Sequence, residues 1–221
     1  MSRVVFSAVL FSAVVCSLSS RADEVDQGIY LRLDTGSSFS RRAGGDVGND
    51  VGTSAIFGGG IGYRFNQYFR SDMTLSYRNG YKVDSSTVMQ GQSYYSRGDV
   101  KSLVGLANVY IEPIKIDGVR PYVGGGLGFA HNTINDVTIE VAGLNGTLQG
   151  ATSTSFAWQA GAGIGIDIVP NLTADIGYRY MDMGESKTGS HVNIAGWTSD
   201  NWTSRGNLRA HELQLGLRYQ F

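Results

Sequence analysis

The segment from Phe156 to Ile168 decides the fold, and it reads Phe-Ala-Trp-Gln-Ala-Gly-Ala-Gly-Ile-Gly-Ile-Asp-Ile. Its even positions are all apolar, whereas its odd positions are Ala, Gln, Gly or Asp. Side chains of a β-strand point alternately to its two faces, so a period of two predicts a strand with one apolar face. The opposite face is rich in glycine, which predicts that it lines a narrow interior.

Seven further segments repeat this alternation. They span residues 29–36, 55–65, 69–78, 100–111, 122–129, 172–180 and 212–221. The parity of the segment 100–111 is ambiguous; we assign Leu103, Ala107, Val109 and Ile111 to the apolar face because this turns Asn108 to the other one. The sequence thus predicts an all-β fold with an even number of strands, eight.

The face opposite the apolar stripe carries the charged residues. In a water-soluble barrel those charges would face solvent, but glycine covers a surface poorly and instead makes room inside a tight barrel. Apolar side chains outside and charged ones inside are typical of an antiparallel, up-and-down transmembrane β-barrel. Unpaired charges in that interior are costly, so the near balance of signs predicts a buried ion-pair network. Its members are Arg32, Asp34, Arg64, Arg70, Asp72, Arg78, Asp167, Asp175, Arg179, Glu212 and Arg218.

Short and long connections alternate along the chain. The short ones are 66–67, 112–119 and 169–171, and the long ones are 40–53, 79–98, 132–153 and 182–207. This alternation predicts short periplasmic turns and four extracellular loops. In the third loop, Asn145-Gly146 predicts a two-residue hairpin turn and a projecting ribbon. In the fourth, Trp197 and Trp202 are candidate partner contacts, with packing on the loop or at the lipid interface as the alternative.

The first 22 residues are expected to be a secretory signal that is removed. Arg3 precedes the apolar stretch 4–15, and Ser20-Arg21-Ala22 offers small residues at a cleavage site. A lipoprotein signal at Cys16 is the alternative, disfavoured by Val15. Residues 23–221 would then form the barrel with no cysteine, a net negative charge and no sign of a nucleic-acid partner. No run of 18 apolar residues follows, so no transmembrane helix is expected.

The C-terminal strand carries Gln214, Gly216, Tyr219 and Phe221 at positions that match the signal read by the barrel-assembly machinery. A final strand that is still unpaired can add to an open sheet edge in that machinery. This strand and the segments 119–129 and 172–180 resemble the OmpA-like small barrels, in particular the opacity-like surface antigens and major outer-membrane proteins of alphaproteobacteria. The resemblance implies location in the outer membrane of a Gram-negative bacterium. It also implies roles as diverse as envelope stabilisation, adhesion and haem binding.

Other chemistry finds little support. The glycine runs 58–62 and 161–165 are not followed by a helix, as a phosphate loop requires. His131, His191 and His211 leave a rim receptor for haem or another ligand, or a lipid A-modifying enzyme, as alternatives. A narrow pore is disfavoured because side chains fill an eight-stranded interior.

We therefore predict a non-enzymatic outer-membrane protein without catalytic residues, cofactor or metal. It would contribute to envelope integrity and present its loops as a surface antigen or adhesin. Its expected partners are outer-membrane lipid and lipopolysaccharide, the assembly machinery during insertion, and a host or surface ligand bound by the loops.

Overall fold

A computed structural model describes residues 27–43, 50–89, 92–141, 144–194, 196–200 and 205–221. The predicted signal lies outside these residues. Among them no helix is long and apolar enough to cross a membrane. The strands are β1 (Gly28–Ala43), β2 (Asp50–Arg64), β3 (Phe69–Met89), β4 (Gln92–Ile111), β5 (Val119–Ile134), β6 (Val137–Val141), β7 (Leu144–Leu148), β8 (Ala151–Val169), β9 (Leu172–Lys187), β10 (Val192–Ile194), β11 (Trp197–Ser199) and β12 (Arg205–Gln220).

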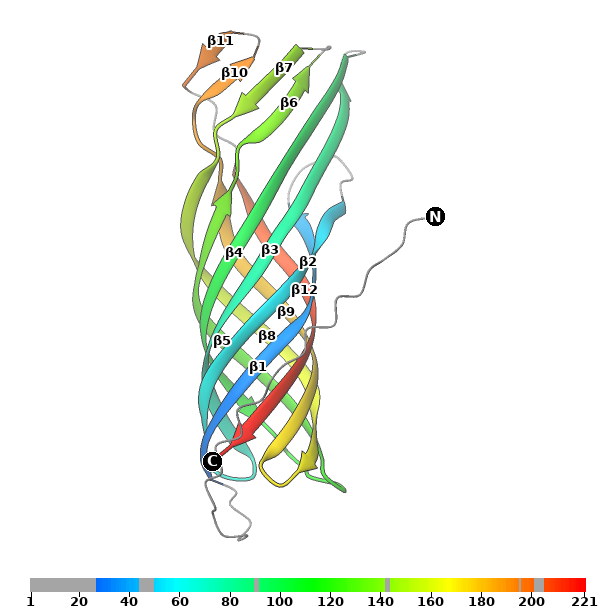
Figure 1. The fold of residues 1–221 in the computed structure, drawn as a ribbon, viewed down its shortest axis with the longest axis vertical. Coiled ribbons are helices and arrows are strands. Elements are labelled where there is room, and N and C mark those ends of the chain that lie inside the picture. The colour runs from blue at the N-terminus through cyan, green and yellow to red at the C-terminus, as the bar shows by residue number, and fades with distance from the viewer. Residues whose placement is uncertain (1–26, 44–49, 90–91, 142–143, 195, 201–204) are drawn as a thin grey trace.

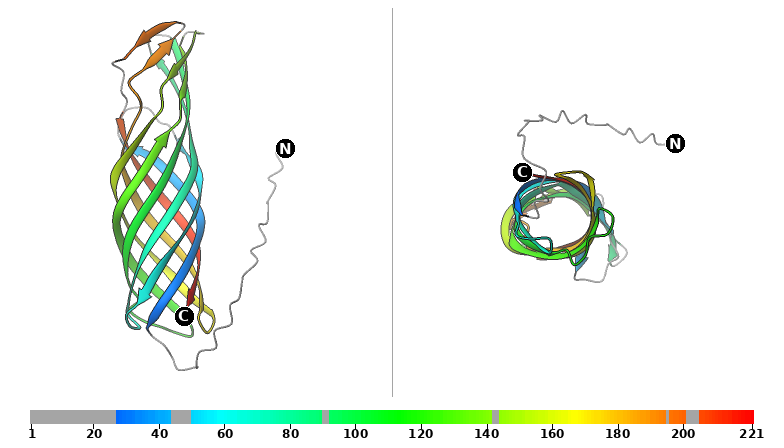
Figure 2. Two further views of the ribbon diagram at one scale, coloured as in Figure 1. Left: turned by 60° about the vertical axis from the view of Figure 1, so that its left-hand side comes forward. Right: turned by 90° about the horizontal axis from the view of Figure 1, so that it is seen from below.

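Eight of these strands close a barrel (Figure 1). Around it they follow the order β1, β2, β3, β4, β5, β8, β9 and β12, each antiparallel to the next. The last strand pairs with the first, from Tyr30↔Gln220 to Ala43↔Asn207, and Figure 2 shows the closed ring from below. Closure leaves the barrel without a sheet edge. The predicted eight-stranded antiparallel up-and-down barrel is confirmed.

The two faces of the sheet have the predicted polarity. Outward side chains such as Leu215 and Met73 are 56% and 69% exposed, whereas inward Arg78 and Glu212 are fully buried. On β4, Asn108 is buried and Val109 exposed, which confirms the parity assigned to the ambiguous segment. An apolar outer face of this extent requires an apolar surrounding.

Three tight connections lie at one end of the barrel, which we call the short-turn end. Asn66 accepts hydrogen bonds from the backbone N–H groups of Tyr68 and Phe69 at 2.8 and 2.9 Å. Asp117 and Gly118 both have positive φ, as a two-residue hairpin turn between paired strand ends requires. Asn171 adopts positive φ in the third turn. These turns bring charged residues of β2, β5 and β8 to one mouth of the barrel.

At the other end of the barrel, which we call the ribbon end, strands extend into segments that were predicted to be loops. The prediction of a loop over 79–98 is wrong: β3 and β4 run on as one ribbon to the pair Met89↔Gln92. A register shift between Arg78 and Tyr81, with Gly80 at φ +74°, separates the ribbon from the barrel wall. The segment reads as a loop because most of its residues are polar or glycine, but its Tyr, Val and Thr residues suit a strand. The loops predicted over 40–53, 132–153 and 182–207 are likewise shortened by the ends of β1, β2, β5, β8, β9 and β12.

The predicted turn at Asn145-Gly146 is also wrong, although the ribbon itself is present. Both residues lie within β7, where they pair with Glu140 and Ile139 of β6. This register sets Val137 opposite Leu148 and Val141 opposite Leu144, so that apolar residues pair across the ribbon. Gly146 instead allows Asn193 and Ile194 of β10 to approach closely, since a Cβ there would collide with both.

The narrow interior gives a matched pair of glycine substitutions. We expect Gly126→Ala to cost about 1–3 kcal/mol, because its Cβ would overlap the Asn108 side chain and the Ala107 carbonyl. Gly105→Ala on the neighbouring strand should be nearly neutral, because its Cβ would meet only the Leu75 side chain at 3.9 Å. Thermal unfolding of the refolded chain in micelles measures both, and equal stability of the two variants would contradict a close-packed interior.

Candidate functional site in the barrel interior and the ribbons

Glu112 is the centre of the charged network near the short turns. It directly follows β4, and it accepts hydrogen bonds from Arg64 at 2.6 Å, Arg70 at 2.7 Å and Arg218 at 3.2 Å. All four side chains are almost completely buried. One carboxylate therefore links arginines of β2, β3 and β12 across the interior.

Aspartates complete this cluster near the short turns. Arg218 forms a two-pronged pair with Asp175, at 2.8 and 3.0 Å. Arg32 pairs in the same way with Asp34, at 2.7 and 2.9 Å, and also contacts Asp72 at 2.8 Å. Two-pronged arginine–carboxylate pairs combine strength with fixed geometry. With Arg64, Arg70 and Glu112, the cluster contains four arginines and four carboxylates, so its charge is balanced.

Tyrosines and amides fill the space between these charges. The Arg70 guanidinium lies 3.7 Å from the centre of the Tyr110 ring, a cation–π contact. The Tyr30 hydroxyl donates to Asp72 at 3.0 Å. Asn108 also donates to Asp72, at 2.8 Å, and accepts from Gln159 at 2.9 Å. These contacts satisfy carboxylate oxygens that would otherwise be buried without a donor.

Glu212 is the centre of a second cluster, which lies nearer the ribbon end of the barrel than the cluster around Glu112. Arg78 contacts both of its oxygens at 2.7 and 3.1 Å, Arg179 donates at 2.6 Å, and the Ser38 hydroxyl donates at 2.9 Å. Two arginines thus share one carboxylate. Among the described residues, Nη2 of Arg179 has no hydrogen-bond partner. The stability of this cluster consequently depends on the single negative charge of Glu212.

An apolar layer lies beside the Glu212 cluster, because the Tyr81 hydroxyl is 2.6 Å from the Ser38 hydroxyl that donates to Glu212. Its side chains are buried and come from five strands of the barrel together with Tyr81 of β3. They are Tyr81, Val104, Leu106, Ala130, Ala157, Met181, Met183, Leu208 and Ala210. Together with the charged clusters, this layer fills the interior with side chains, as the size of an eight-stranded barrel requires.

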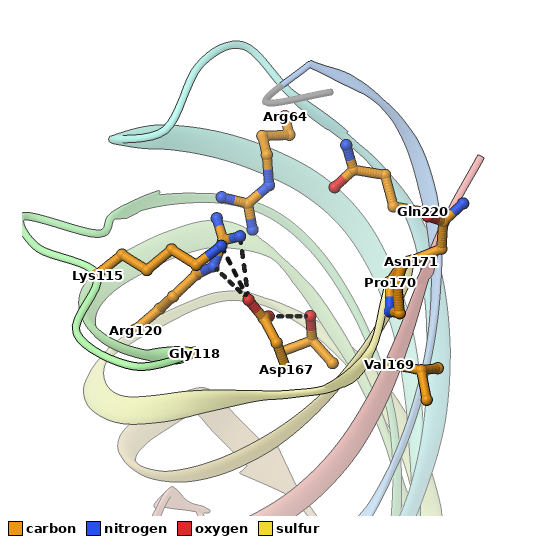
Figure 3. Close-up of a pocket in the computed structure, with 10 residues that line it drawn as sticks. Arg64, Lys115, Gly118, Arg120, Asp167, Val169, Pro170, Asn171 and Gln220 are labelled. Carbon is orange, nitrogen blue, oxygen red and sulfur yellow. Dashed lines mark hydrogen bonds and ion pairs between the residues drawn. The ribbon is translucent and has the colours of Figure 1, made fainter. Parts of the chain in front are cut away.

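The structure thus brings ten of the eleven predicted network residues into two clusters and leaves Asp167 apart. Asp167 lies at the short-turn mouth, where it pairs with Arg120 at 3.2 Å and Lys115 at 3.3 Å (Figure 3). Sequence reasoning missed Glu112 because it was assigned to a turn. The alternation of Tyr110 inward and Ile111 outward, continued by one residue, would have found it.

Aromatic side chains on the outer face gather near both ends of the barrel. Tyr63–Phe65 and Tyr219–Phe221 form edge-to-face pairs, at 5.1 and 5.2 Å, close to the short turns. Toward the ribbon end, Tyr180 contacts Trp158 and His211, with ring centres 5.5 and 5.3 Å apart. Two aromatic belts on an apolar surface mark the two interfaces of a membrane.

Beyond the barrel, the ribbons join into one hydrogen-bonded sheet. The extended part of β4 pairs with β6, β6 with β7, β7 with β10, and β10 with β11 (Figure 1). Trp197 begins β11 and is 60% exposed. Trp202 lies outside the described residues. Segments from three predicted loops therefore form a single surface.

The three histidines have separate partners. His131 contacts Thr154 at 2.9 Å, His211 contacts Tyr178 at 2.5 Å, and His191 contacts Asp200 at 2.5 Å. The described part of the chain contains no group of three or more His, Cys, Asp or Glu residues placed to hold a metal ion. The structure does not assemble these histidines into one site.

Comparison with known families agrees with this architecture. A family model described as "Outer membrane protein beta-barrel domain" matches residues 7–221. The chain belongs to this family. The barrel lies in the outer membrane of a Gram-negative bacterium, where lipid and lipopolysaccharide surround its apolar face. In such barrels the short turns face the periplasm and the long connections face outward. The short-turn end is therefore the periplasmic end, and the ribbon end is extracellular.

Surface proteins of several bacteria are similar to this outer-membrane barrel. The outer membrane protein PagN of Salmonella typhimurium is 28% identical, covering 76% of this chain and 74% of its own. The putative adhesin RC1281 of Rickettsia conorii is 23% identical, covering 91% and 85%. The opacity protein opA65 of Neisseria gonorrhoeae is 27% identical, covering 67% and 63%. These relatives confirm the resemblance to small surface-antigen barrels.

The solved structure of Neisserial surface protein A has the same fold. It matches this chain with a TM-score of 0.52 at 21% identity, covering 88% of this chain and 97% of its own.

Removing the charge of Glu212 tests the interior network. We expect Glu212→Gln to cost about 3–5 kcal/mol, because Arg78 and Arg179 would be left buried without a counter-charge. Glu140→Gln, at an exposed position of β6, is the matched control and should change nothing. Thermal unfolding in micelles provides the measurement. If both variants unfold at the wild-type temperature, the network does not stabilise the barrel.

Proposed function

We propose that this outer-membrane barrel is a non-enzymatic adhesin and surface antigen that binds its partner through the extracellular sheet. The observation that carries the proposal is the continuous pairing of β4, β6, β7, β10 and β11 beyond the barrel. Such pairing holds segments that are distant in the sequence in one fixed surface. A preformed surface loses less conformational entropy on binding than separate loops do.

The similar proteins support this proposal. One relative from Rickettsia is named a putative adhesin and one from Neisseria an opacity protein. The exposed Trp197 adds a side chain of the type that often contributes most to a protein interface. It stands at the start of β11, the terminal strand of the sheet as described.

The interior supports a structural role rather than transport or catalysis. Buried ion pairs and the apolar layer occupy the space through which a solute would pass. A hydrolase combines a hydroxyl nucleophile, a base beside it and an acid that orients the base. His131 contacts the Thr154 hydroxyl, whereas His191 and His211 contact a carboxylate and a phenol, so the hydrogen bonds of the described residues do not bring three such groups together. We infer that the barrel contributes to envelope integrity as a rigid, closed element.

We also propose roles in export and assembly for two segments of the chain. The first 22 residues serve as a cleaved signal, and Gln214, Gly216, Tyr219 and Phe221 serve as the assembly signal. In the folded chain, Tyr219 and Phe221 face outward, and the Phe221 N–H donates to the Ile29 carbonyl at 3.0 Å. These residues thus belong to the seam at which the first and last strands pair.

Adhesion of bacteria that display the protein tests the proposal. A non-adherent laboratory strain would carry the wild-type chain or a variant in which a short glycine–serine linker replaces residues 137–148. We expect the variant to lose most of the adhesion to host cells, because β6 and β7 connect β4 with β10. Trp197→Ala should weaken adhesion in the same direction.

Ile114→Ala, at an exposed apolar position of the periplasmic turn after β4, is the matched control for Trp197. Each variant must retain the heat-dependent gel shift of a closed barrel. Wild-type adhesion by the hairpin variant would contradict the proposal. Haem binding that is lost in a His131→Ala, His191→Ala, His211→Ala triple variant would instead favour the rim-receptor alternative.

A further inference from the structure

A pocket of about 500 Å³ opens at the periplasmic mouth of the barrel (Figure 3). It lies between the turn that follows β4 and the Pro170-Asn171 turn. Its lining combines basic, amide, hydroxyl and apolar side chains. The residues are Arg64, Lys115, Gly118, Arg120, Asp167, Val169, Pro170, Asn171, Thr173 and Gln220.

Three cationic side chains enter this pocket and face one carboxylate, that of Asp167 (Figure 3). Arg120 donates to Oδ2 of Asp167 through both Nε and Nη2, each at 3.2 Å, and Lys115 contacts the same oxygen at 3.3 Å. Oδ1 of Asp167 accepts from the Thr173 hydroxyl at 2.9 Å. Both oxygens of Asp167 are therefore already engaged.

The three cationic side chains keep N–H donors that have no partner among the described residues. Arg64 uses only Nη1, which binds Glu112, so its Nε and Nη2 have no partner among the described residues. Arg120 likewise leaves Nη1 without one there, and a Lys ammonium has three hydrogens of which Asp167 takes one. Figure 3 shows the Arg64 guanidinium directed toward the ends of Lys115 and Arg120.

The local charge is also unbalanced. Arg64 belongs to the balanced interior cluster through Glu112, but Arg120 and Lys115 share the single charge of Asp167. The pocket thus has a surplus of positive charge and of N–H donors in a concave, half-enclosed site. Convergent donors in a concavity are the usual features of a ligand site that recognises an anion.

We propose that this pocket binds the free C-terminal carboxylate of a short peptide in the periplasm. The carboxylate lies among the unused donors of Arg64, Arg120 and Lys115. The pocket volume exceeds that of a small inorganic ion, and Val169 and Pro170 supply an apolar wall for a small side chain. Asn171 and Gln220 add amide side chains to the lining. This binding is independent of the extracellular sheet.

The test is an NMR titration of the refolded chain in micelles with N-acetyl-alanyl-alanine. We expect saturable shifts of residues around the pocket, and no such shifts with the C-terminal amide of the same peptide. Lys115→Gln combined with Arg120→Gln should weaken binding at least tenfold, because it removes two of the three cations. Lys187→Gln, on the extracellular end of β9, is the matched control and should bind as the wild type does.

The Asp167→Asn variant distinguishes recognition of the peptide by the pocket from a purely structural role of the pocket's charges. It removes the competing carboxylate and frees Arg120 and Lys115, so the peptide should bind several-fold more tightly. Loss of binding in Asp167→Asn, equal binding of acid and amide, or binding of inorganic phosphate without the peptide would each overturn the proposal. A heat-dependent gel shift verifies that each variant has folded.

Discussion

Charge pairing inside the barrel is the constraint on which the rest of this structure depends. Eight strands enclose an interior that side chains must fill, and here many of those side chains are arginine and carboxylate. In the absence of bulk water, each charge needs a partner of opposite charge. Glu112 joins β2, β3 and β12, and Glu212 joins β3 and β9 to β12. The pairs thereby fix how opposite walls of the barrel face each other.

Because side chains fill the interior, both proposed binding surfaces lie at the ends of the molecule. The apolar layer around Met181 and Met183 and the charged clusters together fill the barrel between its two ends. The two proposed ligand surfaces, the ribbons outside the cell and the pocket around Asp167 in the periplasm, therefore lie at opposite ends of a filled barrel. The extracellular sheet is joined to the extended part of β4, and the pocket lies at the ends of β2, β5 and β8, so the barrel wall positions both.

The sequence is sufficient to predict the barrel because strands in lipid have a strict period of two. Leu213, Leu215 and Leu217 face outward, and the arginines of the opposite parity face inward, as alternation requires. The partners within the interior were less predictable. Glu112 lies one residue beyond the strand that positions it, and the separation of Asp167 from the clusters depends on the turn that presents Lys115 and Arg120.

The ribbons were predicted poorly for a different reason. Outside the membrane a strand has no lipid to face, so residues 81–89 and 92–98 lose the apolar alternation while remaining paired. Asn145-Gly146 has the composition of a turn, but the register of Val137 with Leu148 and the approach of β10 keep it within β7. Pairing between distant segments decided both cases, and local sequence does not encode that pairing.

Paramagnetic attenuation of methyl signals tests the central claim most directly. The unmodified chain would be studied by NMR in lipid bicelles, with a spin label first on the lipid chains and then free in water. The account predicts that the lipid label attenuates the methyls of Leu213, Leu215 and Leu217, and that both labels spare the methyls of Val104 and Leu106. Attenuation of Val104 and Leu106 by the water-soluble label would reveal an open lumen. Stronger attenuation of these two residues than of Leu215 by the lipid label would contradict the orientation of the whole sheet.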